Sequence, residues 1–225
     1  MHTDYPLPPS PAEAGFLGEF ETHVTVACPD GDLPGLERWA AERGVKLLHI
    51  RLARGRTKSQ PMVTLNGAGS LRQQRVAAEE LTDGLSAAGY RPVRVKIEAT
   101  PWTDGVPASD EDARRLGPER YFEHHLKVAL AADAEREALT AVAVGHGAHV
   151  SWNARRVAGP SGRQQRFVTQ RCHGVGLRTA GDRLDRLVGA VAGAGFDILS
   201  VEREFVVYDS NLAVDDGWLD GTDRR

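Results

Sequence analysis

Phe20-Glu21-Thr22-His23-Val24-Thr25-Val26 is the stretch that decides the fold, because a second copy follows as Phe122-Glu123-His124-His125-Leu126-Lys127-Val128. Phe, Glu, His and the final Val recur at the same spacing in both copies. If each copy is a β-strand, its side chains alternate between the two faces of a sheet. One face is then mainly apolar, whereas the opposite face carries an ionisable stripe. The stripe comprises Glu21 and His23 in the first copy and Glu123, His125 and Lys127 in the second.

The repeat extends well beyond these two strands, whose positions differ by 102 residues. Residues 60–64 match residues 165–169 at an offset of 105, and residues 95–98 match residues 201–204 at an offset of 106. Nearly constant offsets across several elements indicate an internal duplication. The alternative is two amphipathic units that are similar by coincidence.

Turn and capping signals around the two copies predict the order βαββαβ twice, which is the ferredoxin-like plan. A capping box at Ser70 and Gln73 predicts the start of a helix that runs to Ala88, and Asp32 can cap an earlier helix that ends at Gly44. The other expected elements are strands at about 19–27, 45–53, 60–65, 92–99, 121–129, 148–157, 164–171 and 197–208, and helices at about 133–144 and 182–194.

The predicted fold class is α+β, a tandem duplication of ferredoxin-like units whose sheets face each other across a central polar cavity. The open sheet faces carry too many charges for a dry core, because each unpaired buried charge costs several kcal/mol. Two side-by-side modules with solvated outer sheets are the alternative. The expected boundaries are a disordered arm at 1–15, unit one at 16–100, a linker at 101–118, unit two at 119–208 and a C-terminal tail at 209–225.

The C-terminal tail is crowded with acidic and aromatic residues. We expect this segment to fold back onto the protein, with Trp218 as its anchor and Tyr208 or Asp209 reaching the rim of the cavity. Its three acids do not have the spacing of an EF-hand loop.

Composition bounds the class of protein. The chain of 225 residues is 41% hydrophobic and 26% charged, as is ordinary for a globular protein. Its net charge of −3 implies no bulk attraction to nucleic acid or to anionic membranes. No apolar run approaches the ~18 residues of a membrane span, and the first residues do not form a secretory signal. Cys28 and Cys172 form no CxxC motif, so we expect reduced thiols in a cytoplasmic protein, with its oligomeric state left open.

Imidazole and carboxylate groups on facing strands are the first candidate chemistry, because this mixture suits Zn, Mn or Fe, and carboxylates alone suit Mg. A divalent metal is therefore the expected cofactor, and the sequence contains no nucleotide-binding motif. Salt bridges between oppositely charged strands are the alternative explanation for these residues. The expected metal ligands are Glu21, His23, Glu123 and His125.

Basic residues on or beside the same strands are the second candidate chemistry, since Arg and Lys bind carboxylate and phosphate oxygens. The expected partner is an anionic, phosphate-bearing small molecule. A solvated basic turn is the alternative for residues 54–58, and the strand before it is expected to point His49 and Arg51 into the cavity. The expected substrate-binding residues are Arg51, Arg155, Lys96, Lys127, Thr64 and Thr169, and the expected catalytic groups are His23, His125, Glu98 and Glu204.

His23-Val24-Thr25-Val26 resembles the His-hydrophobic-Thr-hydrophobic strand of the two-histidine phosphoesterases, which use two such motifs in a pseudo-symmetric fold. The repeat partner departs from that pattern, because Lys127 stands where Ser or Thr belongs. Glu123-x-His125-x-Lys127, with Glu202-x-Glu204, resembles the charged strands of the triphosphate-tunnel (CYTH) enzymes, with His125 where those enzymes carry Glu. Both resemblances imply a phosphate-bearing substrate.

Over nearly its whole length the chain also resembles bacterial proteins of unassigned function, which share Tyr121-Phe122-Glu123 and Tyr208-Asp209-Ser210-Asn211. This resemblance supports the extent of the domains and implies no activity. Together the residues favour a small-molecule enzyme, such as a metal-assisted phosphoesterase or other hydrolase. The alternatives are a non-catalytic ligand-binding or regulatory module and a structural dimerisation unit, so whether the chain is an enzyme stays open.

Overall fold

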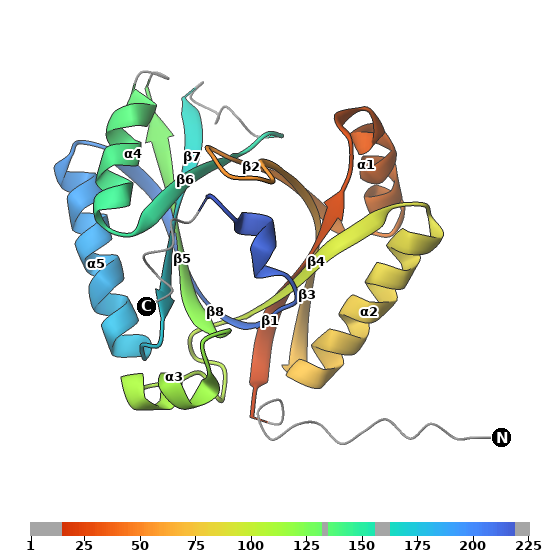
Figure 1. Ribbon diagram of the computed structural model, residues 1–225, viewed down its shortest axis with the longest axis horizontal. Helices are drawn as coiled ribbons and strands as arrows, with labels where there is room; N and C mark the ends of the chain where they lie inside the picture. Colours follow the sequence, from red (N-terminus) through yellow and green to blue (C-terminus); the bar gives the residue numbers. More distant parts are fainter. Residues whose placement is uncertain (1–14, 132–134, 156–162, 219–225) are drawn as a thin grey trace.

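Eight antiparallel strands form one closed barrel in the order β1-β3-β2-β6-β7-β5-β8-β4 (Figure 1). The computed structural model describes residues 15–131, 135–155 and 163–218. The strands are β1 (Leu17–Ala27), β2 (Lys46–Leu52), β3 (Ser59–Ser70), β4 (Arg91–Ala99), β5 (Tyr121–Leu130), β6 (Ala148–Asn153), β7 (Gln164–His173) and β8 (Asp197–Asp209). The helices are α1 (Leu33–Glu42), α2 (Leu71–Ala87), α3 (Asp110–Leu116), α4 (Glu135–Gly145) and α5 (Leu177–Gly193), with short 3₁₀ helices η1 (Asp30–Asp32) and η2 (Leu212–Asp215).

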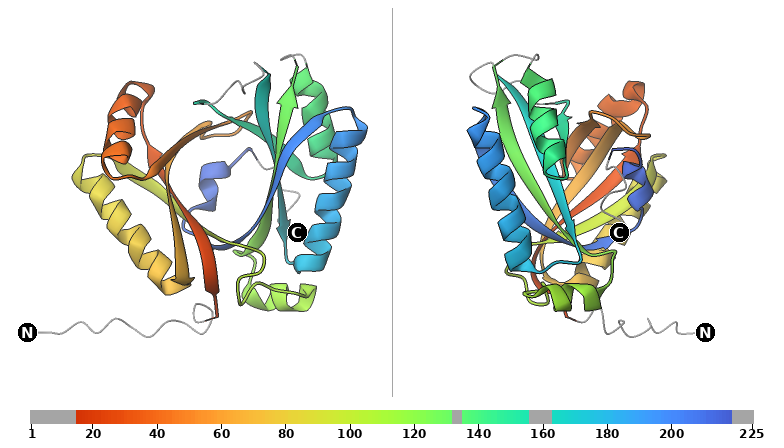
Figure 2. Two further views of the ribbon diagram at one scale, coloured as in Figure 1. Left: turned by 180° about the vertical axis from the view of Figure 1, so that it is seen from behind. Right: turned by 60° about the vertical axis from the view of Figure 1, so that its left-hand side comes forward.

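Two βαββαβ units supply four strands each, which confirms the predicted α+β fold and its internal duplication. Helices α1 and α2 lie outside one half of the barrel, and α4 and α5 lie outside the opposite half (Figures 1 and 2). Helix α3 lies in the connection between the units. The open faces of the two sheets therefore meet inside a single ring.

The two units join at seams that are shorter than most of the pairings within a unit. β2 pairs with β6 through three residue pairs, between residues 50–52 and 151–153. β4 pairs with β8 through four residue pairs, between residues 96–99 and 205–209. By contrast, β1 and β3 pair through nine residue pairs within the first unit. These two seams close the ring, so neither unit keeps an edge strand of its own.

Local sequence signals set the starts of the helices. Ser70 and Gln73 form the predicted capping box at the start of α2. Asp32 occupies the N-cap position of α1, but its side chain makes no capping hydrogen bond, so the start signal there is Pro34 in the first turn. The expected linker between the units contains α3, which the Ser109 side chain caps.

The hydrophobic core lies between the strands and the helices, outside the ring of strands. In the first unit Val24 and Val26 of β1 pack in one cluster with Leu36 and Trp39 of α1. Burial of apolar area contributes about 25 cal/mol per Å², so these contacts fix which face of each strand points outward. The corresponding cluster of the second unit contains Leu126, Val128, Leu139, Leu184 and Leu187.

The segment after β8 folds back into one end of the barrel, where η2 lies within the ring of strands (Figure 1). Trp218 is buried, and its Nε1 donates a hydrogen bond to the carbonyl of Val150 at 3.3 Å. Gly55 packs against this segment at φ +108°, where a Cβ would lie 3.0 Å from the Trp218 nitrogen. Trp218 therefore occupies the anchoring position that the sequence predicted for it.

Some expectations concern residues outside the described part of the chain. The predicted disordered arm lies there except for Gly15, as do residues 156 and 157 of the strand expected at about 148–157 and the last seven residues of the tail. Within the part that the structure describes, no helix is both long enough and apolar enough to cross a membrane.

Candidate functional site

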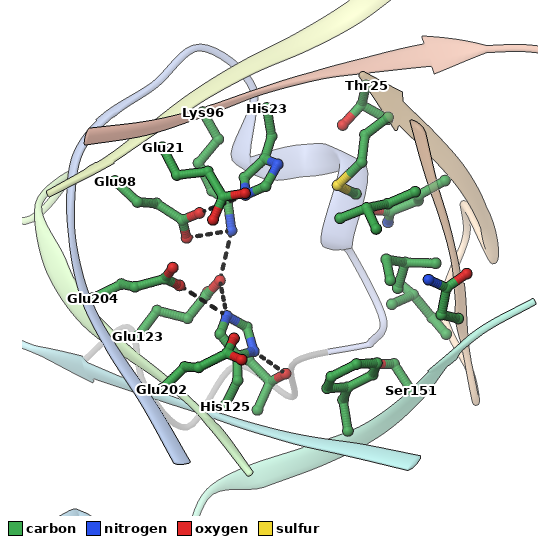
Figure 3. Close-up of a pocket in the computed structure, with 18 of the residues that line it drawn as sticks. Glu21, His23, Thr25, Lys96, Glu98, Glu123, His125, Ser151, Glu202 and Glu204 are labelled. Atoms are coloured by element: carbon green, nitrogen blue, oxygen red, sulfur yellow. Dashed lines mark hydrogen bonds and ion pairs between the residues drawn. The ribbon is translucent and has the colours of Figure 1, made fainter. Parts of the chain in front are cut away.

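The barrel interior holds a cavity of about 280 Å³ with two chemically different walls (Figure 3). Ionisable side chains of β1, β4, β5 and β8 form the ionised wall, and apolar side chains of β2, β3, β7 and the tail form the apolar wall. The ionised wall contains Glu21, His23, Lys96, Glu98, Glu123, His125, Glu202 and Glu204. The apolar wall contains Leu48, Ile50, Leu52, Met62, Phe167 and Trp218, and Lys127 and Thr169 also line the cavity.

Strand β2 faces the other way from the sequence expectation. Leu48 and Ile50 line the cavity, so their neighbours His49 and Arg51 lie on the outer face of the strand. Arg51 forms an ion pair with Asp30 at 3.0 Å on that side. A strand face made of Leu and Ile is typical of a hydrophobic core, but in this protein that face of β2 lines the cavity.

Arg155 also lies away from the cavity wall. Its side chain is partly exposed and forms an ion pair with Glu37 of α1. The guanidinium groups that do line the cavity are Arg94 and Arg171, which the sequence reading placed outside the site or only beside it.

Two matching hydrogen-bonded triads stand on the pseudo-symmetric strands. In the first unit His23 Nδ1 shares a hydrogen bond with Thr64 Oγ1 at 2.8 Å, and His23 Nε2 lies 2.9 Å from Glu98 Oε2. In the second unit His125 Nδ1 and Thr169 Oγ1 are 2.9 Å apart. The same ring faces two carboxylates through Nε2, Glu204 at 3.3 Å and Glu123 at 3.4 Å.

Lys96 joins the two units at the centre of the ionised wall. Its Nζ lies 2.7 Å from Glu98 Oε1 and 2.6 Å from Glu123 Oε1 (Figure 3). Glu98 is 2% exposed, and its two oxygens lie 2.7 Å from Lys96 Nζ and 2.9 Å from His23 Nε2. A carboxylate has about four lone-pair sites, so Glu98 can accept further hydrogen bonds beside these two contacts.

These ion pairs fix the charges of the central groups. Burial alone would lower the pKa of Lys96, but Glu123 and Glu98 outweigh burial and raise it. Burial would raise the pKa of Glu98, but Lys96 and a neighbouring histidine lower it to about 2. Burial would lower the pKa of His125, but Glu123 and Glu204 raise it to about 10. Lys96, Glu98 and His125 are consequently all charged at neutral pH.

The neighbouring residue His124 behaves in the opposite way. It points to the other face of β5, is 2% exposed and contacts the side-chain oxygen of Gln170 at 3.3 Å. Burial lowers the pKa of His124 to about 4. His124 is thus neutral at pH 7, as expected of a histidine in a core.

A second buried charge network ties the tail to both units. Asp215 accepts hydrogen bonds from Arg94 and Arg171, each at 2.8 Å, and from Gln60 at 2.9 Å. Arg171 also pairs with Glu123, which connects this network to the ionised wall. Burial would raise the pKa of Asp215, but Arg171 and Arg94 lower it to about 2.

Sequence reasoning missed most of this second network. Arg94 lies two residues before Lys96 on β4, and Arg171 lies two residues after Thr169 on β7, so strand alternation points both into the cavity. Strand alternation could therefore have predicted that Arg94 and Arg171 line the cavity. The position of Asp215 between them depends on contacts across 121 and 44 residues of sequence, which no local pattern predicts.

One group of side chains in the described ranges has the arrangement of a metal site. Ligand atoms of Glu98, Glu123 and His125 all lie within 4.8 Å of one another. His125 and Glu123 belong to the expected ligand set, whereas Glu21 lies further out, 3.5 Å from Lys46 Nζ. Two carboxylates and one imidazole suit Zn or Mn, provided that His125 loses its proton and Lys96 moves away.

Comparisons with solved structures find proteins of similar fold, but with low TM-scores and low sequence identity. No family model matches the chain, and no curated protein matches it. The small subunit of acetolactate synthase from Thermotoga maritima is 10% identical over 85% of this chain and 95% of its own, with a TM-score of 0.30. The regulatory subunit of aspartate kinase from Thermus flavus is 15% identical over 80% and 97% of the two chains, with a TM-score of 0.33. A putative chlorite dismutase is 16% identical over 88% and 97%, with a TM-score of 0.27. None of these similarities bears on the function of this chain.

Proposed function

We propose that this protein is a ligand-binding module that takes a small molecule into the barrel and has a non-catalytic, regulatory role in the cytoplasm. One observation carries the proposal: a single cavity of about 280 Å³ sets an apolar wall opposite an ionised wall. Small-molecule sites combine apolar lining with a few fixed polar groups in this way, and this volume is near the lower end of their range.

The charge state of the ionised wall favours binding over proton transfer. An acid–base catalyst works best when its pKa lies near the operating pH. The pKa of His125 is raised to about 10 and that of Glu98 is lowered to about 2, so both groups keep one charge across neutral pH. Fixed charges in fixed positions are suited to orienting a ligand.

Methionine labelling tests whether the cavity takes up a small molecule. The chain has two methionines, Met1 and Met62, and Met62 lines the cavity. We would label the methionine methyl groups with ¹³C, assign the Met62 signal with Met62→Leu, and titrate octylammonium, 1-octanol and octanoate. A saturable shift of the Met62 signal with one of these probes is expected.

A blocked cavity provides the control. Ile50→Trp places a larger side chain on the apolar wall, so the Met62 shift should disappear while the melting temperature shows that the variant is folded. Loss of the shift in Ile50→Trp supports binding in the cavity. If none of the three probes moves the Met62 signal, or if Ile50→Trp responds like the wild type, the module does not bind ligands in this cavity.

A metal-assisted hydrolase is the second candidate, favoured by the cluster of Glu98, Glu123 and His125. A divalent ion held there would supply the positive charge that attracts a phosphate group and polarises it. His23 would stand beside the ion as an acid–base group, because Thr64 fixes its ring orientation. Glu204, and Lys127 on the cavity wall, would complete the site in this proposal.

Metal analysis of the purified protein tests this second candidate. A hydrolase is supported if the wild type contains stoichiometric Zn or Mn and hydrolyses p-nitrophenyl phosphate. Both the metal and the hydrolysis should then be lost in a His23→Ala/His125→Ala double variant. If the folded wild-type protein contains no metal and shows no hydrolysis, but its Met62 signal still responds to a probe, the hydrolase is excluded and the ligand-binding function remains.

A further inference from the structure

We infer that the ligand of this cavity is a cationic amphiphile, a small molecule with an ammonium or similar positive group at one end of an apolar body. This inference deepens the proposed ligand-binding function and depends on it. The chemistry of the opening, the state of the cations in the wall and the position of the apolar wall all contribute to it.

The cavity opens to the outside past a ring of carboxylates. An open pocket of about 1000 Å³ borders the cavity, and the two share the five residues of the neck, Glu21, Lys46, Glu98, Glu202 and Glu204. Four carboxylates and one ammonium give these five residues a formal charge of −3, and Lys96 and His125 inside the cavity pair with two of the carboxylates. A narrow opening with charge of one sign attracts ligands of the opposite sign and repels ligands of the same sign.

Three buried cations of the cavity are already neutralised by the protein, whereas Lys127, which also lines the cavity, forms no ion pair within the described ranges. Lys96 contacts Glu98 and Glu123, and Arg171 contacts Glu123 and Asp215. Arg94 similarly holds Asp209 and Asp215. An anionic ligand would have to break these buried pairs, which is costly because it leaves a buried charge without its partner.

The carboxylates, in contrast, retain capacity for a cation. Each oxygen of Glu98 makes one contact, with Lys96 or with His23, and a carboxylate has acceptor sites beyond two such contacts. Glu202 has no ion-pair partner in the part of the chain that the structure describes. Glu202 lines the neck together with Glu98 and Glu204. A cationic group placed among these carboxylates would reduce the repulsion between their negative charges.

The apolar wall completes the match. Leu48, Ile50, Met62 and Phe167 line the cavity. Figure 3 shows carbon-rich side chains on the side of the cavity opposite the labelled glutamates. A ligand whose positive group lies at the neck can therefore place a hydrocarbon body against these side chains. A bare metal ion would use the carboxylates and leave the apolar wall uncovered.

The charge of the probe decides this inference. Octylammonium, 1-octanol and octanoate share a hydrocarbon chain and differ in charge, so their dissociation constants from the Met62 titration isolate the effect of charge. In a buffer with EDTA, we expect octylammonium to bind at least about tenfold more tightly than either of the others. This preference should shrink at high salt, because exposed charges are screened.

Paired variants locate the effect at the neck. Glu202→Gln/Glu204→Gln should reduce the preference for octylammonium to less than about threefold and leave octanol affinity unchanged. Glu79→Gln/Glu80→Gln makes the same change of charge on the exposed face of α2 and should leave the preference intact. Octanol or octanoate binding as tightly as octylammonium, or a preference that survives in the neck variant, overturns the inference. The proposed ligand-binding function would still stand in those cases, because it fails when no probe moves the Met62 signal or when Ile50→Trp responds like the wild type.

Discussion

The two units of the barrel keep the same histidine geometry but carry different charges around it. Thr64, His23 and Glu98 in the first unit repeat as Thr169, His125 and Glu204 in the second, and the two His–Thr distances differ by only 0.1 Å. The position of Lys96, however, is taken by Glu202 at the offset of 106 residues, and the position of Arg171 corresponds to Asn66 at the offset of 105.

This divergence explains how a duplicated chain builds one asymmetric site. Glu123 of the second unit is buried between Lys96 of the first unit and Arg171. Its equivalent in the first unit, Glu21, lies at the neck beside an exposed lysine. A symmetric pair of units would place like charges opposite each other, so the substitutions both remove repulsion and create an ion pair across the units.

The largest expected difference concerns these two equivalent glutamates. Glu123→Gln leaves the buried Lys96 and Arg171 short of one partner and should lower the free energy of unfolding by about 3–5 kcal/mol. Glu21→Gln removes an exposed ion pair and should cost less than about 1 kcal/mol. Urea denaturation of both variants measures the two values, and equal costs would show that the burial of Glu123 has no energetic consequence.

The next effect is a loss of stability at alkaline pH that depends on His125. The pKa of His125 is about 10 in the folded protein and about 6.5 in an unfolded chain, so its contribution is complete below pH 6.5 and is lost as the pH rises through 10. Between pH 7 and 10 the wild type should lose roughly 3 kcal/mol more than His125→Gln.

His124 provides the matched control for this measurement. Its pKa is lowered to about 4, so it stabilises the protein above pH 6.5, and that contribution is lost as the pH falls towards 4. His124→Gln should therefore flatten the acid side of the stability curve and leave the alkaline side as in the wild type. An alkaline slope that is the same in His125→Gln and in the wild type would contradict the assignment.

A smaller effect concerns metal affinity. Lys96 places an ammonium between Glu98 and Glu123, where a divalent ion would otherwise bind, so Lys96→Met should bind Zn²⁺ about tenfold more tightly than the wild type. Competition with a chromophoric chelator measures the affinities. Lys46→Met, a change outside the cluster, should leave the affinity unaltered, and a wild-type affinity in Lys96→Met would show that the lysine does not occupy the metal position.

The smallest effect tests what the two units still share. Thr64→Val and Thr169→Val each remove one hydrogen bond to a histidine, and each should cost about 1 kcal/mol. Because the two triads have the same geometry, the costs should agree to within about 0.5 kcal/mol in chemical denaturation. A larger difference would mean that the two histidines rely on their threonines unequally.

The duplication, the order of elements and the polar interior could be predicted because each leaves a periodic signal. The repeated Phe-x-x-His pattern locates the equivalent strands, and strand alternation separates the ionised side of β1 and β5 from the core side. The same signal failed for β2, where Leu48 and Ile50 were assigned to the core face. Alternation shows that two faces differ, but it cannot tell a core face from the apolar wall of a cavity.

The contacts of the C-terminal tail could be predicted only in part from the sequence. Trp218 stood out as a large apolar residue in an acidic segment, so its anchoring position could be predicted. The pairing of Asp215 with Arg94 and Arg171 depends on closure of the whole ring, which brings β4 and β7 to the same end of the cavity. No spacing in the sequence encodes that meeting.

The short seams have a consequence for the history of such a chain. In the first unit alone, β2 and β4 would be edge strands without a hydrogen-bonded neighbour on one side. In the second unit alone, the same would hold for β6 and β8. Two copies of a single ancestral unit could cover all four edges by pairing with each other. The ring has the arrangement that a dimer of such units would have, and a single chain can carry Lys96 and Glu202 at equivalent positions, where two identical copies could not.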